Sequence, residues 1–258
     1  MELLGYTAAV FIGFMLGLTG GGGSILTVPV LVYLFGIDPL MATAYSLFVV
    51  GTTSLVGGVK AYIKKQIDFM ALSMFGIPSI FTIFIARHFI LPALPTTILS
   101  INKGSFLMLV FAVLMLITAL YMLKPKTELK QTDATQLYKP LSLLIPGLVL
   151  GLLTGMLGAG GGFLIIPALV IILKLPMQKA IGTSLLIIAI NSTFGVLFSL
   201  KLFQFQWNFL FILSALAVIG VLIGSWYSAK LNNKQLRKFF GVFVLLMACY
   251  ILVRELFL

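Results

Sequence analysis

The sequence predicts an all-α integral membrane protein made of two homologous halves with inverted topology. Two observations lead to this fold class: an unusually apolar composition, and an internal repeat built around two glycine clusters. Of the 258 residues, 61% are apolar and 9% are charged, whereas about a quarter of the residues in an ordinary soluble domain are charged. A soluble chain of this length must cover much of its surface with polar groups. The composition therefore excludes a soluble domain.

The apolar runs are continuous, which predicts helices as the membrane-spanning elements. A transmembrane β-barrel would alternate apolar and polar residues in segments of about ten. Here many runs approach the roughly 20 residues that a helix needs to cross a bilayer. Residues 124–139 form a polar interruption that is expected to be an aqueous loop. The ten apolar segments are residues 3–18, 25–35, 40–59, 69–91, 106–123, 141–157, 163–173, 180–200, 207–229 and 239–253.

The second half of the chain repeats the first at one fixed offset. Residues 17–29 (GLTGGGGSILTVP) align with residues 155–167 (GMLGAGGGFLIIP). Internal duplication is typical of secondary transporters. We therefore expect a first transmembrane repeat at residues 1–123, a cytoplasmic linker at 124–140 and a second repeat at 141–258. The register continues through the pairs Ala42/Ala180, Ser46/Ser184, Ser54/Ser192 and Gly57/Gly195.

Two of the segments are too short to span a bilayer alone. Residues 25–35 and 163–173 contain eleven residues each and directly follow the glycine clusters. A helix of that length reaches about 16 Å, or half of a hydrocarbon core. Each half is thus expected to hold a glycine-hinged pair of segments, one of them short, plus three transmembrane helices. Paired interrupted segments are the best sequence indication of a transporter's binding site.

The basic residues predict how the chain is oriented. The sequence has 17 Lys and Arg against 6 Asp and Glu, a net charge of +11. If each glycine cluster joins segments that enter and return, as a re-entrant hairpin or as two full spans, the basic residues divide thirteen to four. If each cluster instead breaks one crossing helix, they divide nine to eight. The positive-inside rule favours the first arrangement. It places both termini outside the cell membrane, the central loop in the cytoplasm and the second half inverted.

Several classes of function are excluded by what the sequence lacks. The basic residues lie in short loops and form no aromatic-basic patch, so nucleic acid is not an expected partner. Cys249 is the only cysteine and His88 is the only histidine, so neither a disulfide framework nor a usual zinc or haem site is expected. The sequence offers no nucleophile–base pair. We expect no metal, no cofactor and no enzymatic activity.

The ionisable residues give little indication of a proton relay. Asp38, Asp68 and Glu255 stand near segment ends and are interpreted as solvated end residues. Lys60, Arg87 and His88 are interpreted as side chains that reach from a span to the membrane interface. Lys60 has a second interpretation, which is to attract anions at the inner mouth of a transport path.

The glycine clusters themselves are the candidate site. Glycines ahead of a short helix expose N–H groups at its positive end, a combination that binds anions without a formal charge. Two such helix starts are expected to converge near the membrane midplane. The alternative is tight helix packing, with hydroxyl groups bonded to the preceding turn. The candidate substrate-binding residues are Thr19, Gly20, Gly21, Gly22, Gly23, Ser24, Gly158, Gly160, Gly161, Gly162, Thr53, Ser54, Asn191 and Ser192.

The doubled glycine motif, the two-half layout and the length together resemble the TauE/SafE family, the sulfite exporter or TSUP-type permeases. The first copy of the motif differs from the second in having Gly21 for Ala159 and Ser24 for Gly162. The resemblance covers nearly the whole chain and implies transport of sulfite, organosulfonates or related sulfur-containing or organic anions.

The expected function is secondary transport of a small anion by alternating access. A passive anion channel and a transporter of non-sulfur organic anions are the alternatives. The expected partners are the anion and the lipid bilayer. The exact substrate, the direction of transport, the coupling ion and the oligomeric state stay open.

Overall fold

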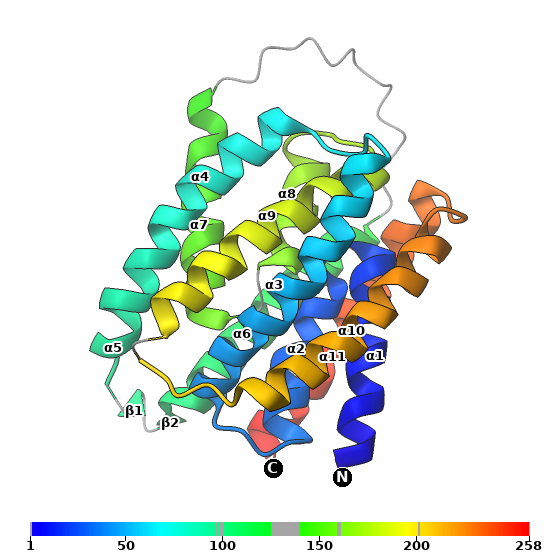
Figure 1. Ribbon diagram of the computed structural model, residues 1–258. Coiled ribbons are helices and arrows are strands. Elements are labelled where there is room, and N and C mark those ends of the chain that lie inside the picture. Colours follow the sequence, from blue (N-terminus) through cyan, green and yellow to red (C-terminus); the bar gives the residue numbers. More distant parts are fainter. Residues whose placement is uncertain are drawn as a thin grey trace.

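The protein is a bundle of helices, seen here in a computed structural model that describes residues 2–95, 97–98, 101–124, 140–158, 161–200 and 202–257 (Figure 1). Within those ranges, 6 helices are long and apolar enough to cross a membrane, which confirms the all-α membrane fold. Two short strands, β1 (Thr97–Ile98) and β2 (Ile101–Asn102), pair in antiparallel fashion. The helices are α1 (Glu2–Thr19), α2 (Gly22–Tyr33), α3 (Pro39–Ile63), α4 (Phe69–Ile85), the π-helix η1 (Ala86–Ile90), α5 (Leu91–Ala93), α6 (Lys103–Leu123), α7 (Pro140–Leu157), α8 (Gly162–Ile171), α9 (Met177–Ser199), α10 (Trp207–Ser228) and α11 (Asn233–Phe257).

Two of the scarce acidic residues serve to start helices. The carboxylate of Asp38 accepts the backbone N–H of Leu40 at 2.9 Å, with Pro39 in the first turn of α3. The carboxylate of Asp68 accepts the N–H of Ala71 at 2.9 Å and starts α4. Such N-caps satisfy backbone donors that the helix leaves unpaired. Their place at helix ends agrees with the interpretation made from the sequence.

The repeat in the sequence is also a repeat in the helices. The two glycine motifs are 138 positions apart, and the starts of three pairs of helices are separated by the same offset. The pairs of helix starts are Glu2 of α1 and Pro140 of α7, Pro39 of α3 and Met177 of α9, and Phe69 of α4 and Trp207 of α10. Figure 1 shows the members of each pair running in opposite directions, with both chain ends at the same end of the bundle. Opposite directions are what two inverted halves require. Which end faces the cytoplasm stays a prediction.

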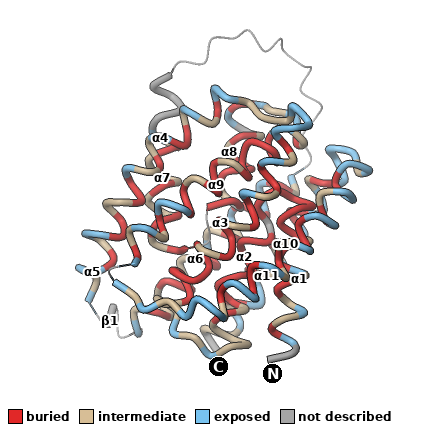
Figure 2. Tube along the Cα trace, viewed as in Figure 1, coloured by how far each residue is buried: buried red, intermediate tan, exposed pale blue. Residues whose placement is uncertain are grey.

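Helices α3 and α9 form the centre of the bundle. Their apolar windows are 67% and 61% buried, against 33–44% for the other long spans, and Figure 2 shows the same concentration of buried residues. A Cβ at Gly57 would lie 3.2 Å from Leu185, and one at Gly51 would lie 3.0 Å from Ser192. Because later residues of α3 contact earlier residues of α9, the two helices are antiparallel. The outer helices expose large apolar side chains, as contact with lipid requires.

Both short segments are short helices in the structure. Helix α2 has 12 residues and α8 has 10, so each reaches roughly half of a hydrocarbon core. Their N-caps are Gly21 and Gly161, which carry no side chain to cap the free N–H groups. Residues 125–139, most of the expected linker, lie outside the described residues. The boundaries of the two repeats stay a prediction.

Candidate functional site

The two glycine clusters meet inside the bundle. A Cβ on Gly21 would clash with the carbonyl oxygen of Gly162, and a Cβ on Gly162 would lie 2.8 Å from the Cα of Gly21. The starts of α2 and α8 therefore touch backbone to backbone, an approach that only glycine permits. Gly22 is the first residue of α2, whereas Gly160 lies outside the described residues. The structure thus brings together the two helix starts that the sequence predicts to converge.

Two equivalent serines connect the halves at this point. The hydroxyl of Ser46 donates to the carbonyl oxygen of Gly158, and the hydroxyl of Ser184 donates to that of Gly20 at 3.0 Å. Both glycines adopt the left-handed backbone, with φ of +76° at Gly20 and +70° at Gly158. Each half thereby holds the hinge of the other. The sequence register contains Ser46 and Ser184, but it does not show that they bond across the halves.

Several of the predicted side-chain donors make local hydrogen bonds. Thr19, Ser24 and Thr53 each donate at 2.6 Å to a carbonyl three or four residues earlier in the chain. A Cβ on Gly23 would clash with the carbonyl oxygen of Ile12 in α1. These contacts are the ones that the packing alternative expects. This glycine in particular permits α2 to pack closely on α1.

Other predicted donors lie at the crossing of α3 and α9. The hydroxyls of Ser54 and Ser192, which occupy equivalent positions, are buried and have no hydrogen-bond partner among the described residues. Asn191 is also buried, and its Oδ1 accepts a hydrogen bond of 2.8 Å from the hydroxyl of Ser79. Buried polar groups normally find partners. Two hydroxyls at the centre are therefore exceptions among the described residues.

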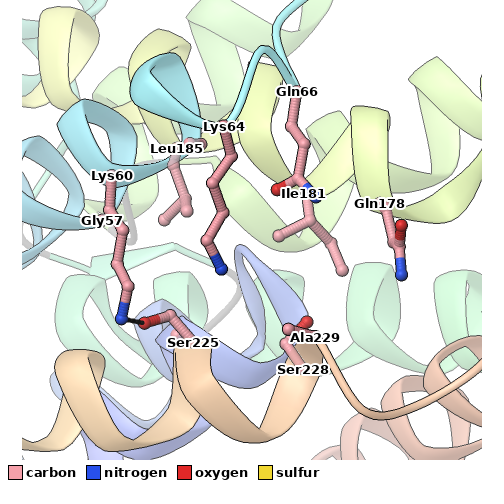
Figure 3. Close-up of a pocket in the computed structure, with 12 residues that line it drawn as sticks. Gly57, Lys60, Lys64, Gln66, Gln178, Ile181, Leu185, Ser225, Ser228 and Ala229 are labelled. Carbon is pink, nitrogen blue, oxygen red and sulfur yellow. Dashed lines mark hydrogen bonds between the residues drawn. The ribbon is translucent and has the colours of Figure 1, made fainter.

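A pocket opens beside the first glycine cluster, between α1, α3, α9 and α10 (Figure 3). The ammonium of Lys60 donates to the hydroxyl of Ser225 at 2.7 Å, and the side chain of Lys64 extends into the same space. None of the described residues that line the pocket is acidic, so its electrostatic character is positive. The position of Lys60 in this pocket is compatible with both interpretations made from the sequence, an interface side chain and a residue that attracts anions. The lining residues are Gly17, Gly57, Lys60, Ala61, Lys64, Gln66, Gln178, Ile181, Leu185, Ser225, Ser228 and Ala229.

Larger side chains stand at two equivalent positions beside the second glycine cluster. At the shared offset, Phe198 stands where the pocket has Lys60, and Arg87 stands where it has Ser225. The ring of Phe198 packs edge-on against Phe84, with centroids 5.1 Å apart. Arg87 is 0% exposed, and its Nη2 lies 3.4 Å from the carbonyl oxygen of Thr43. One end of the site is hollow and the other is packed.

The chain is similar to known proteins over nearly its whole length. A family model described as "Sulfite exporter TauE/SafE" matches residues 6–251. The chain belongs to this family. The TauE/SafE chain is 30% identical over 257 residues to a "Probable membrane transporter protein" of Xylella fastidiosa strain 9a5c, covering 95% of the chain and 92% of the relative. It is 24% identical over 284 residues to the "Probable membrane transporter protein YunE" of Bacillus subtilis strain 168, covering 98% and 100%. No solved structure matches the chain.

The family match confirms the resemblance and makes the protein a multi-pass membrane transporter. The relatives' names specify no substrate. Only the geometry of the candidate site residues therefore indicates what this TauE/SafE protein binds. Within the part of the chain that the structure describes, no three His, Cys, Asp or Glu side chains gather closely enough to hold a metal ion.

The interpretation of Arg87 as an interface residue of this TauE/SafE protein is wrong. Its side chain is completely buried, whereas that of His88 is exposed and stacks on Phe84. Arg87 lies in the π-helix η1, in which the N–H of Leu91 bonds the carbonyl of Ala86 five residues earlier. Pro92 follows and offers no N–H to an α-helical ladder, which favours the wider turn.

Proposed function

We propose that this transporter carries small anions, with sulfite, an organosulfonate or another sulfur-containing anion as substrate. The observation that supports the proposal most is the contact between the starts of α2 and α8 at Gly21 and Gly162. Helix N-termini present N–H donors and partial positive charge, which together bind anions. The description of the family as a sulfite exporter supplies sulfite as the first substrate to test.

The proposed route leads from the pocket to the meeting of the two short helices. Lys60 and Lys64 would attract an anion into the pocket, because no carboxylate in its lining competes for their charge. The glycine amides would then bind the anion, with Ser54 and Ser192 as nearby donors. Release at the other end requires the packing around Phe198 to open. We propose alternating access, with one half moving against the other.

Counterflow in proteoliposomes tests this proposal. Purified protein is reconstituted with unlabelled sulfite inside, and the entry of labelled sulfite is followed with thiosulfate, sulfoacetate, taurine or acetate as competitor. We expect saturable counterflow that sulfur oxyanions inhibit more than acetate. If no sulfur oxyanion enters, the substrate proposal is wrong. If flux rises without saturation and shows no counterflow, the passive channel replaces alternating access.

A further inference from the structure

Arg87 is a buried cation whose hydrogen-bonding capacity is mostly unused. It is the largest fully buried side chain of the described residues, and its Nε and Nη1 have no partner among them. Its one hydrogen bond, from Nη2 to the carbonyl of Thr43, is long at 3.4 Å. A guanidinium offers five N–H donors and is always charged. Burying such a group unpaired has a large free-energy cost, and in a membrane span it is an indication of function.

The three acidic side chains that the structure describes are engaged elsewhere. Asp38 and Asp68 cap the starts of α3 and α4. Glu255 in α11 accepts a hydrogen bond of 2.7 Å from Tyr33. None of the three balances the charge of Arg87. No described carboxylate thus supplies the counter-charge of Arg87, and a bound anion would supply it.

Arg87 faces the second glycine cluster by way of Thr43. The Thr43 carbonyl oxygen accepts from Arg87, and a Cβ on Gly158 would clash with the same oxygen. The hydroxyl of Thr154 is buried with no partner among the described residues, and a Cβ on Gly161 would clash with it. The guanidinium thus lies beside Gly158 by way of Thr43, and the hydroxyl of Thr154 lies beside Gly161 at the start of α8. Donor groups of this kind suit an anion.

We propose that Arg87 binds the oxygen atoms of the transported anion at the second glycine cluster. The proposal rests on the proposed function and adds the residue that supplies the formal charge. A planar guanidinium presents two-donor forks, Nε with Nη2 and Nη1 with Nη2, and such a fork matches two oxygens of a sulfite, sulfonate or carboxylate group. The class of ligand is accordingly an oxyanion, and halides, which offer no pair of oxygens, bind more weakly.

The test compares anion binding in R87M with that in wild-type protein and in R254Q, all purified at full length. Arg254 is a suitable control because its guanidinium stacks 3.9 Å from the ring of Tyr33 and does not face the glycine cluster. Sodium sulfite, sodium sulfoacetate and sodium chloride are titrated, and binding is followed by calorimetry and by thermal unfolding. We expect sulfite affinity to fall at least about thirtyfold in R87M, as when one partner of a buried charged contact is removed. R254Q should bind as the wild type does.

The melting temperature without anion separates ligand binding from a structural role. R87M should melt at or above the wild-type temperature, because the substitution removes an unpaired buried charge. A lower melting temperature, or unchanged sulfite affinity, overturns the role of Arg87 while leaving the proposed function intact. Absence of sulfite and sulfoacetate binding and counterflow in the wild type overturns both. If R87M cannot be purified, R87K is expected to bind sulfite at least about tenfold more weakly, and unchanged affinity is the contrary result.

Discussion

The two glycine clusters share a backbone framework but differ in the side chains around it. Gly20 and Gly158 adopt the same left-handed conformation, and an equivalent serine from the opposite half donates to each. Around Gly20 the structure leaves a pocket lined by lysines, whereas around Gly158 the buried Arg87 and aromatic rings occupy the equivalent space. Duplication thus supplies a common hinge. The side chains have diverged, so one end holds a pocket while Phe198 packs against Phe84 at the other.

The largest effect is expected where the two clusters touch. Gly21→Ala and Gly162→Ala each place a Cβ against the backbone of the other cluster. The helix starts must then separate, and a displacement of this size is expected to lower sulfite counterflow about a hundredfold. Gly76→Ala is the matched control, since a Cβ there meets nothing within 4 Å. Unchanged counterflow in both cluster variants would contradict a site at this contact.

A second experiment measures the difference between the hollow and the packed end. Ala61 lines the pocket, and its counterpart Ser199 is 0% exposed. In a background with Cys249 replaced by alanine, Ala61→Cys should react with a membrane-impermeant maleimide about ten times faster than Ser199→Cys, because rates follow the accessible population. The label should act only from the cytoplasmic face. Equal labelling rates would contradict the difference between the two ends. Labelling from the outer face would contradict the predicted topology.

The smallest effect concerns the feature that the two ends share. Ser46→Ala and Ser184→Ala each remove one hydrogen bond between the halves. We expect a similar loss of about 1 kcal/mol in the free energy of unfolding for each variant. Ser73→Ala is the control, because the Ser73 hydroxyl is exposed and bonds only its own helix. Chemical unfolding in detergent measures the losses, and a loss in only one cluster variant would show that the two bonds are not equivalent.

The sequence by itself determined the helices, the duplication and the two short segments. Continuous apolar runs specify membrane helices because each span must satisfy its own backbone. The glycine clusters and the fixed offset of 138 positions predicted where α2 and α8 begin to within a few residues. These features are local or repeat in register, so they can be found without knowledge of the packing. Substrate binding at the clusters stays a prediction.

Only the tertiary structure decided which residues meet. Gly21 touches Gly162, and Ser46 reaches Gly158 across 112 positions of sequence. Whether a hydroxyl bonds its own turn, as that of Thr53 does, or stays unpartnered, as that of Ser54 does, depends on the neighbouring helix. The burial of Arg87 likewise depends on the packing of η1 against α7 and α9. Such contacts join segments that are distant in the chain, so no local pattern encodes them.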